Sequence, residues 1–132
     1  MAAARRGVDV SVIVPAKVDS VLVQYASHAL LKDLLKAGVK VALYQPGMLH
    51  TKSLVVDQAY SIFGSLNIDP RSLRINFEIC LGIFDEAFAR SLGDLQDKYL
   101  QQSTLLVAGS KLSEGRLTRL KEDLSRLASP LL

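Results

Sequence analysis

The chain has 132 residues, of which 49% are hydrophobic and 22% are charged, so its composition is that of one globular domain and excludes a disordered protein. Its formal net charge of +3 allows anionic partners such as phosphate or lipid head groups, but does not by itself indicate nucleic acid. The single cysteine, Cys80, excludes an internal disulfide and an all-cysteine metal site, and we expect it to be a small buried residue.

The first part of the chain predicts two buried strands with a helix between them. Residues 8–14 (VDVSVIV) are β-branched and apolar, and Pro15 closes this strand. Residues 21–37 carry apolar side chains at helical spacing, and Gly38 is expected to end the helix as a C-cap. Residues 39–44 (VKVALY) predict the second strand.

The middle of the chain predicts three further strands. Residues 51–56 and 59–63 read as two short strands around Asp57 and Gln58. Residues 74–84 read as a longer strand in which polar and apolar side chains alternate. Its apolar face holds Ile75, Phe77, Ile79 and Leu81, and its polar face holds Asn76, Glu78 and Cys80.

Two amphipathic helices are expected toward the carboxyl terminus, at residues 86–101 and around the leucines of residues 117–127. A looser stretch at residues 103–110 separates them and is the candidate linker. We expect an α/β fold with a mixed β-sheet and flanking helices, organised as a single domain over residues 1–132 in which residues 103–132 form a helical tail.

The sequence contains no apolar run of the roughly 18–20 residues that span a bilayer, and MAAARRGVDV lacks the apolar core of a signal peptide. We therefore expect this chain to be soluble or peripheral to a membrane. The basic residues of the last helix are compatible with an anionic bilayer, but the sequence favours packing of its leucine stripe onto the domain or onto a missing half. Because a strand pattern follows Arg5 and Arg6 almost directly, we also expect the chain to be a piece of a longer protein.

Six polar residues gather within a mostly apolar stretch, and Gly64 among them allows another group to approach the backbone closely. The six are His50, Lys52, Asp57, Ser65, Asn67 and Glu78. Side chains two positions apart on a strand share a face, which pairs His50 with Lys52 and Ser65 with Asn67. Asp57 is an odd number of steps from His50 and should face away, so a turn role is as well supported as a catalytic one.

These residue types fit a phosphate-ester site that works without metal. An imidazole serves as nucleophile or general acid–base near neutral pH, and a lysine supplies positive charge to a phosphoryl oxygen. A hydroxyl and an amide add hydrogen bonds. We expect Glu78 to bond the far ring nitrogen of His50 and fix its tautomer, as the acid does in serine-protease triads. The sequence shows no carboxylate cluster for magnesium and no set of zinc ligands.

The order and spacing of these residues resemble the phospholipase D superfamily, whose HKD motif reads H-x-K-x4-D and is followed by G-S/G-x-N and a later acidic residue. The longer stretches YQPGMLHTKSLVVD, GSLNIDPRSLRINFE and LSRLASPLL are similar to the carboxy-terminal half of bacterial cardiolipin synthases. The resemblance covers essentially the whole chain. It implies a phospholipase D-like half-domain, catalytic roles for His50, Lys52, Asp57 and Glu78, and phosphate binding by Lys52, Ser65 and Asn67.

The resemblance also implies a reaction. A motif histidine attacks phosphorus, and a phosphatidyl group passes from one phosphatidylglycerol to the hydroxyl of another, with release of glycerol and without a metal or organic cofactor. Such enzymes lie at the bacterial inner membrane, on its cytoplasmic side or as peripheral proteins.

The chain holds a single copy of the motif, because His28 lies in a helical pattern without a matching lysine and aspartate. The second motif is expected from a missing amino-terminal half or from a second copy of the chain. Three alternatives remain open from the sequence: a homodimeric phosphodiesterase or nuclease, a phospholipase D, and a catalytically incomplete fragment. The mild charge does not favour nucleic acid.

Overall fold

The computed structural model describes residues 1–17, 30–67, 72 and 75–107, and its chain divides into two compact units. The first unit comprises Met1–Leu49 and Ser103–Leu132, and the second comprises His50–Gln102. His28, the first part of the predicted helix and residues 108–132, with the predicted last helix, lie outside the described residues. The expectation of a single domain stays a prediction.

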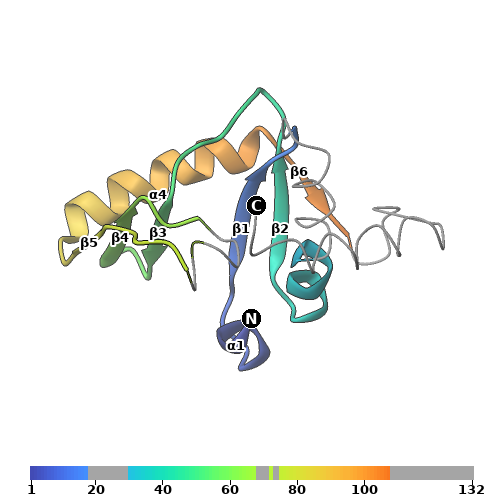
Figure 1. The fold of residues 1–132 in the computed structure, drawn as a ribbon, viewed down its shortest axis with the longest axis horizontal. Helices are drawn as coiled ribbons and strands as arrows, with labels where there is room; N and C mark the ends of the chain where they lie inside the picture. The colour runs from blue at the N-terminus through green and yellow to red at the C-terminus, as the bar shows by residue number, and fades with distance from the viewer. Residues whose placement is uncertain (18–29, 68–71, 73–74, 108–132) are drawn as a thin grey trace. The chain divides into compact units, whose positions relative to one another are not determined.

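The first unit contains a three-stranded sheet in the order β1-β2-β6 (Figure 1). β1 (Ser11–Pro15) pairs in parallel with β2 (Lys40–Tyr44), as expected for strands joined by a helical crossover. β1 therefore begins later than predicted and includes Pro15. A short helix that the sequence did not predict, α1 (Ala2–Arg5), precedes it.

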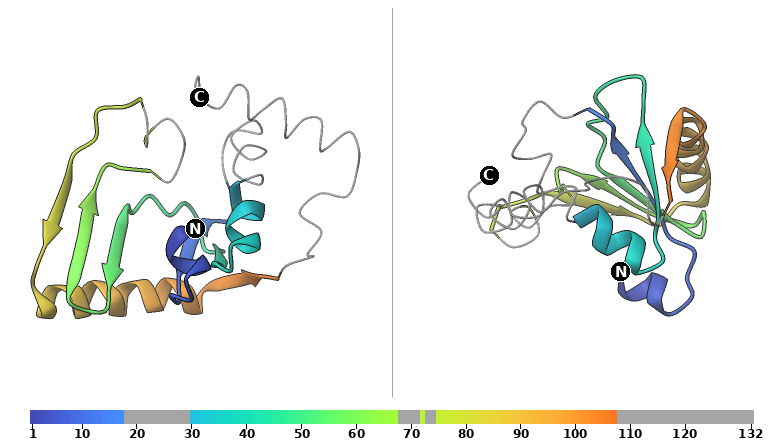
Figure 2. Two further views of the ribbon diagram at one scale, coloured as in Figure 1. Left: turned by 90° about the horizontal axis from the view of Figure 1, so that it is seen from below. Right: turned by 90° about the vertical axis from the view of Figure 1, so that its right-hand side faces the viewer.

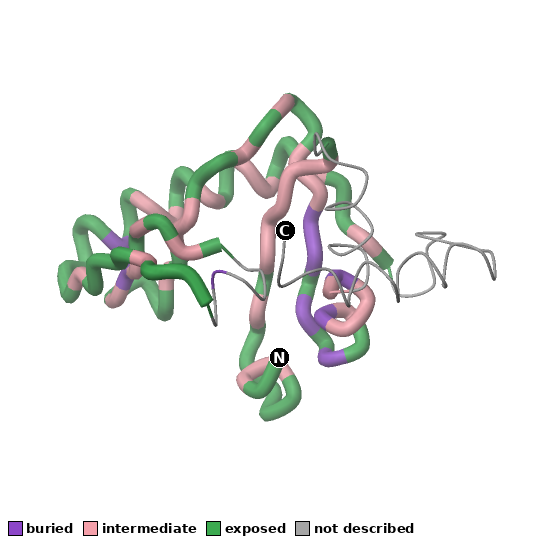
Figure 3. The backbone as a smooth tube through the Cα atoms, in the orientation of Figure 1, coloured by how far each residue is buried: buried purple, intermediate pink, exposed green. Residues whose placement is uncertain are grey.

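The described part of the predicted long helix, residues 30–36, ends as expected at Gly38. The Gly38 N–H donates to the Leu35 carbonyl and the Val39 N–H to the Leu34 carbonyl, both at 3.0 Å, which is the Schellman pattern. Gly38 has φ +85°, a conformation that glycine adopts without a steric cost. The tight turn feeds the chain directly into β2, and the apolar core of this unit surrounds that junction (Figure 3); its buried members are Leu31, Leu34, Val39 and Val41.

The expectation of a loose linker at residues 103–110 is wrong for its first four positions. Ser103–Leu106 forms β6, which pairs antiparallel with β2, and Gln45 Nε2 donates to Thr104 Oγ1 at 3.1 Å beside this pairing. The described start of the expected helical tail is therefore a strand. Its partner lies about sixty residues earlier in the chain, so local sequence carries little sign of it.

The second unit is an antiparallel sheet in the order β3-β4-β5 with one long helix. Its strands are β3 (Ser53–Val56), β4 (Tyr60–Gly64) and β5 (Cys80–Ile83). α4 (Glu86–Gln101) has the predicted bounds, and the Asp85 side chain caps it by accepting the Phe88 N–H at 2.6 Å. The helix contacts β3 and β4 and lies across the strands (Figure 2), and its Gln96 Nε2 donates to Ser53 Oγ at 3.0 Å.

The predicted strand over residues 74–84 is too long, because among its described residues, 75–84, only Cys80–Ile83 is a strand. The apolar side chains that alternate before it are exposed, and Phe77 is fully so. Cys80 is exposed as well, which corrects the expectation that it would be buried. The alternation predicts the direction of the side chains, but it does not reveal how far the backbone pairing extends.

Within the ranges that the structure describes, no helix combines the length and the apolar character needed to cross a membrane.

Candidate active site

The strand register of the second unit brings three separate sequence segments together at one end of the sheet. The Gly64 N–H donates to the Lys52 carbonyl at 3.1 Å, which continues the β3–β4 pairing by one step. The Ser65 N–H donates to the Ile79 carbonyl at 2.9 Å, which continues the β4–β5 pairing in the same way. These pairings align the start of β3, the end of β4 and the approach to β5.

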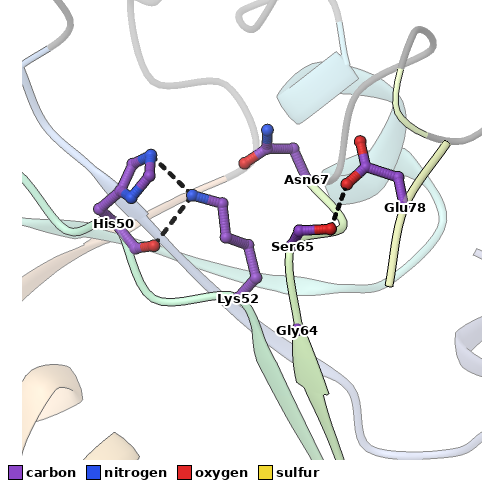
Figure 4. Close-up of a pocket in the computed structure, with 6 residues that line it drawn as sticks. All are labelled: His50, Lys52, Gly64, Ser65, Asn67 and Glu78. Carbon is purple, nitrogen blue, oxygen red and sulfur yellow. Dashed lines mark hydrogen bonds between the residues drawn. The ribbon is translucent and has the colours of Figure 1, made fainter. Parts of the chain in front are cut away.

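An open cavity of about 370 Å³ lies where these segments meet. Figure 4 shows the side chains around it, with His50 and Lys52 on one side, Glu78 on the other, and Asn67 between them. The cavity is lined by His50, Lys52, Gly64, Ser65, Asn67 and Glu78. Five of the six polar residues singled out from the sequence therefore share one site.

Asp57 is the residue that the structure does not bring to the cavity. It lies in the tight turn between β3 and β4, where Asp57 and Gln58 have φ of 50° and 54°. The Ala59 N–H donates to the Val56 carbonyl at 3.1 Å and closes the turn. Positive φ at both central positions matches the twist of a hairpin, and aspartate tolerates this conformation better than most residues. The geometry supports the turn role of Asp57.

Gly64 permits the close approach on which the site depends, as expected. A Cβ built at this position would overlap the Ile79 carbonyl oxygen and would lie 2.7 Å from the Cys80 Cα. Both groups belong to the backbone of the neighbouring strand, so neither can rotate away. The position therefore accepts only glycine without a shift of β5 relative to β4.

His50 and Lys52 point the same way, as their spacing predicts. Lys52 Nζ lies 2.7 Å from His50 Nε2 and donates to the His50 carbonyl oxygen at 3.0 Å. A lysine ammonium only donates hydrogen bonds, so His50 Nε2 is the acceptor when the two groups bond. The contact places the ring nitrogen and the positive charge together at the cavity, where both can reach one phosphoryl group.

Glu78 is held by hydrogen bonds from neighbouring side chains. Ser65 Oγ donates to Oε2 at 2.5 Å, and Asn76 Nδ2 donates to Oε1 at 3.2 Å. Hydrogen bonds from the Ser65 and Ser72 side chains hold the pKa of the Glu78 carboxyl below its usual value, although burial opposes them. Asn76 and the positive charge of Lys52 lower this pKa further.

The expected hydrogen bond between Glu78 and the far ring nitrogen of His50 is not among these contacts, so that expectation is wrong within this chain. Ser72 is a buried residue whose hydrogen bond helps to lower the pKa of Glu78, and the sequence did not predict this contact. A serine six positions before the glutamate carries no distinctive pattern, and its contact arises from tertiary structure. Among the residues that the structure describes, no three His, Cys, Asp or Glu side chains gather in a way that could hold a metal ion.

Comparison with known proteins finds similarity to one family over most of the chain. Residues 1–99 match the family described as "Cardiolipin synthase, PLD-like domain". Cardiolipin synthase A of Escherichia coli O157:H7 is 49% identical over 130 residues, and the same enzyme of E. coli K12 is 48% identical. Each alignment covers 98% of this chain but 27% of the relative, so the chain spans about a quarter of the length of these enzymes.

A solved structure shares the fold. The crystal structure of a phospholipase D family member, Nuc from Salmonella typhimurium, superposes with a TM-score of 0.70 at 22% sequence identity. The match covers 80% of this chain and 69% of that one. This likeness confirms the α/β fold class predicted from the sequence.

Proposed function

Because the chain belongs to the cardiolipin synthase family of phospholipase D-like domains, we propose that it contributes half of the catalytic site of an enzyme that forms cardiolipin from two phosphatidylglycerol molecules. The observation that carries this proposal is the convergence of an imidazole, an ammonium, an amide and a carboxylate on one open cavity. That set offers a nucleophile or base, a positive charge and hydrogen-bond donors for a phosphodiester.

The proposed reaction exchanges one phosphate ester for another in two displacements. A histidine ring nitrogen attacks phosphorus, a P–N bond forms, and the P–O bond to the leaving glycerol breaks as that oxygen takes a proton. The hydroxyl of a second phosphatidylglycerol then attacks phosphorus, loses its proton to a base, and breaks the P–N bond. Lys52 and the Asn67 amide are suited to hold the phosphoryl oxygens, where negative charge increases in each transition state.

The two displacements call for two proton-transfer partners, and we propose that a second histidine is supplied from outside this chain. Its source is the remaining part of a longer synthase or a second copy of the chain. His50 acts either as the nucleophile or as the acid–base partner. In this proposal the enzyme works at the bacterial inner membrane, where its lipid substrates are, with peripheral contact by this chain.

A chimera tests the function. The chain replaces the matching carboxy-terminal region of E. coli cardiolipin synthase A, and membranes from a cardiolipin-deficient strain that carries the chimera receive labelled phosphatidylglycerol. We expect labelled cardiolipin and free glycerol, with a rate that changes less than about twofold in EDTA, because Lys52 and the amide stabilise the phosphoryl charge directly. Loss of product in EDTA with recovery on added Mg²⁺ would contradict the metal-independent site.

The chimera assay and one further experiment separate the remaining alternatives. A chimera that stays inactive, although it is produced at the level of the parent enzyme, would favour a catalytically incomplete fragment. The purified chain incubated with plasmid DNA in EDTA tests the homodimeric nuclease, for which cutting is the supporting result. Release of phosphatidic acid in place of cardiolipin would indicate a phospholipase D.

A further inference from the structure

The hydrogen-bond network beside the cavity directs the single hydrogen of the Ser65 hydroxyl toward Glu78. Ser65 Oγ accepts the Ile79 N–H at 3.0 Å, and it donates its own hydrogen to Glu78 Oε2 at 2.5 Å. A serine hydroxyl has one hydrogen, so it does not donate to a phosphoryl oxygen at the same time. Its geometry therefore suits the orientation of a carboxylate better than the binding of a phosphate.

The other carboxylate oxygen is engaged as well. Asn76 Nδ2 donates to Glu78 Oε1 at 3.2 Å from a bend two residues before the glutamate. With the Ser72 hydrogen bond, three donors contact a group that has roughly four acceptor positions. About one position then remains for a donor in the cavity.

We propose that Ser65 and Asn76 are positioning residues that hold the Glu78 carboxylate as an oriented anion at the cavity wall, and that Ser65 is not a phosphate ligand. The proposal deepens, and rests on, the phosphatidyl transfer proposed above. It replaces the phosphate-binding role that the family resemblance implies for Ser65.

An anion held in this way accepts a hydrogen bond or stabilises a nearby positive charge, but it does not serve as a proton donor. His50 and Lys52 are the other titratable groups that line the cavity. Because the surrounding donors lower the pKa of Glu78, its carboxylate stays charged to a lower pH than a free glutamate. Loss of the Ser65 or the Asn76 hydrogen bond should raise the pKa of Glu78, so that the carboxylate is protonated at higher pH.

The first test measures Glu78 directly in the complete 132-residue chain, without any activity assay. Carbon-13 NMR follows the side-chain carboxyl signals of glutamate against pH, and the Glu78→Gln variant assigns the signal of interest. We expect the pKa of Glu78 to rise in Ser65→Ala and in Asn76→Ala, and to stay near that of the unsubstituted chain in Ser65→Thr, which keeps a hydroxyl donor. Unchanged titration in both alanine variants would overturn the proposal.

The second test measures turnover in the cardiolipin synthase chimera. We expect kcat to fall about tenfold to a hundredfold in Ser65→Ala and Asn76→Ala, with KM nearly unchanged and the acid limb of the pH–rate profile moved to higher pH. Ser65→Thr should restore both kcat and the profile. A raised KM with unchanged kcat and profile in Ser65→Ala would instead make Ser65 a phosphate ligand.

A negative result in the turnover test does not decide the outcome of the carboxyl titration. If the chimera without these substitutions makes no cardiolipin, the proposed function is contradicted, and the carboxyl titration still decides whether Ser65 and Asn76 position Glu78. If Ser65→Ala does not fold, as judged by the dispersion of its amide NMR spectrum, the comparison of Asn76→Ala and Ser65→Thr with the unsubstituted chain decides the titration test.

Discussion

Replacement of His50 by alanine in the cardiolipin synthase chimera should lower phosphatidyl transfer about ten-thousand-fold or more, which is the order of loss expected when a nucleophile or its proton-transfer partner is removed. Lys52 Nζ lies 2.7 Å from the His50 ring nitrogen, so the substitution takes the reactive nitrogen away from the cation that would neutralise the phosphoryl group. The measurement is the initial rate of labelled cardiolipin formation, with protein amount matched by immunoblot.

The matched control for His50→Ala is Asp57→Asn, because Asp57 belongs to the same sequence motif but lies in the hairpin turn and not at the cavity. Asparagine tolerates positive φ as well as aspartate does, so this variant should keep transfer within several-fold of the unsubstituted chimera. Near-normal transfer by the His50→Ala variant, or equal losses in both variants, would refute the assignment of His50 to the reacting centre.

Replacement of Gly64 by alanine should destabilise the chain by about 3 kcal/mol and should also disrupt the cavity. The added Cβ would overlap the Ile79 carbonyl oxygen, so the backbones of β4 and β5 would have to separate. That separation would break the Ser65–Ile79 pairing that aligns Ser65 with Glu78. Urea denaturation followed by circular dichroism measures the change in the free energy of unfolding.

Gly93→Ala is the control for this substitution. Gly93 lies inside α4, and a Cβ built there meets nothing within 4 Å. Alanine in an open helical position should stabilise the chain by roughly 0.5–1 kcal/mol, because glycine has a poor helix propensity. A Gly64→Ala variant as stable as the unsubstituted chain would show that β4 and β5 do not approach as closely as the structure indicates.

The elements predicted well are those whose sequence signals are local. α4 has the expected bounds because its apolar stripe and the Asp85 cap lie within a few residues of each other. The helix end at Gly38 follows from one residue and its φ of +85°. By contrast, the linker expected at residues 103–110 begins with β6, whose pairing with β2 is a long-range contact.

The residues of the site also differ in whether local sequence or long-range pairing determines their contacts. The common direction of His50 and Lys52 follows from the two-residue period of an extended chain, and the structure confirms it. The partners of Glu78 depend on the register between β4 and the approach to β5, which no local pattern specifies. For that reason the sequence assigned Glu78 to His50, whereas the structure pairs it with serine and asparagine side chains.

Nitrogen-15 NMR of the 132-residue chain, titrated with glycerophosphoglycerol as the soluble head group of phosphatidylglycerol, tests most directly whether one cavity binds a phosphodiester. The predicted result is that the His50 ring nitrogens and the Asn67 side-chain amide shift together with a single dissociation constant, while the Gly93 amide in α4 does not move. Signals that shift with different constants, or that do not shift up to saturating ligand, would contradict a common phosphodiester site.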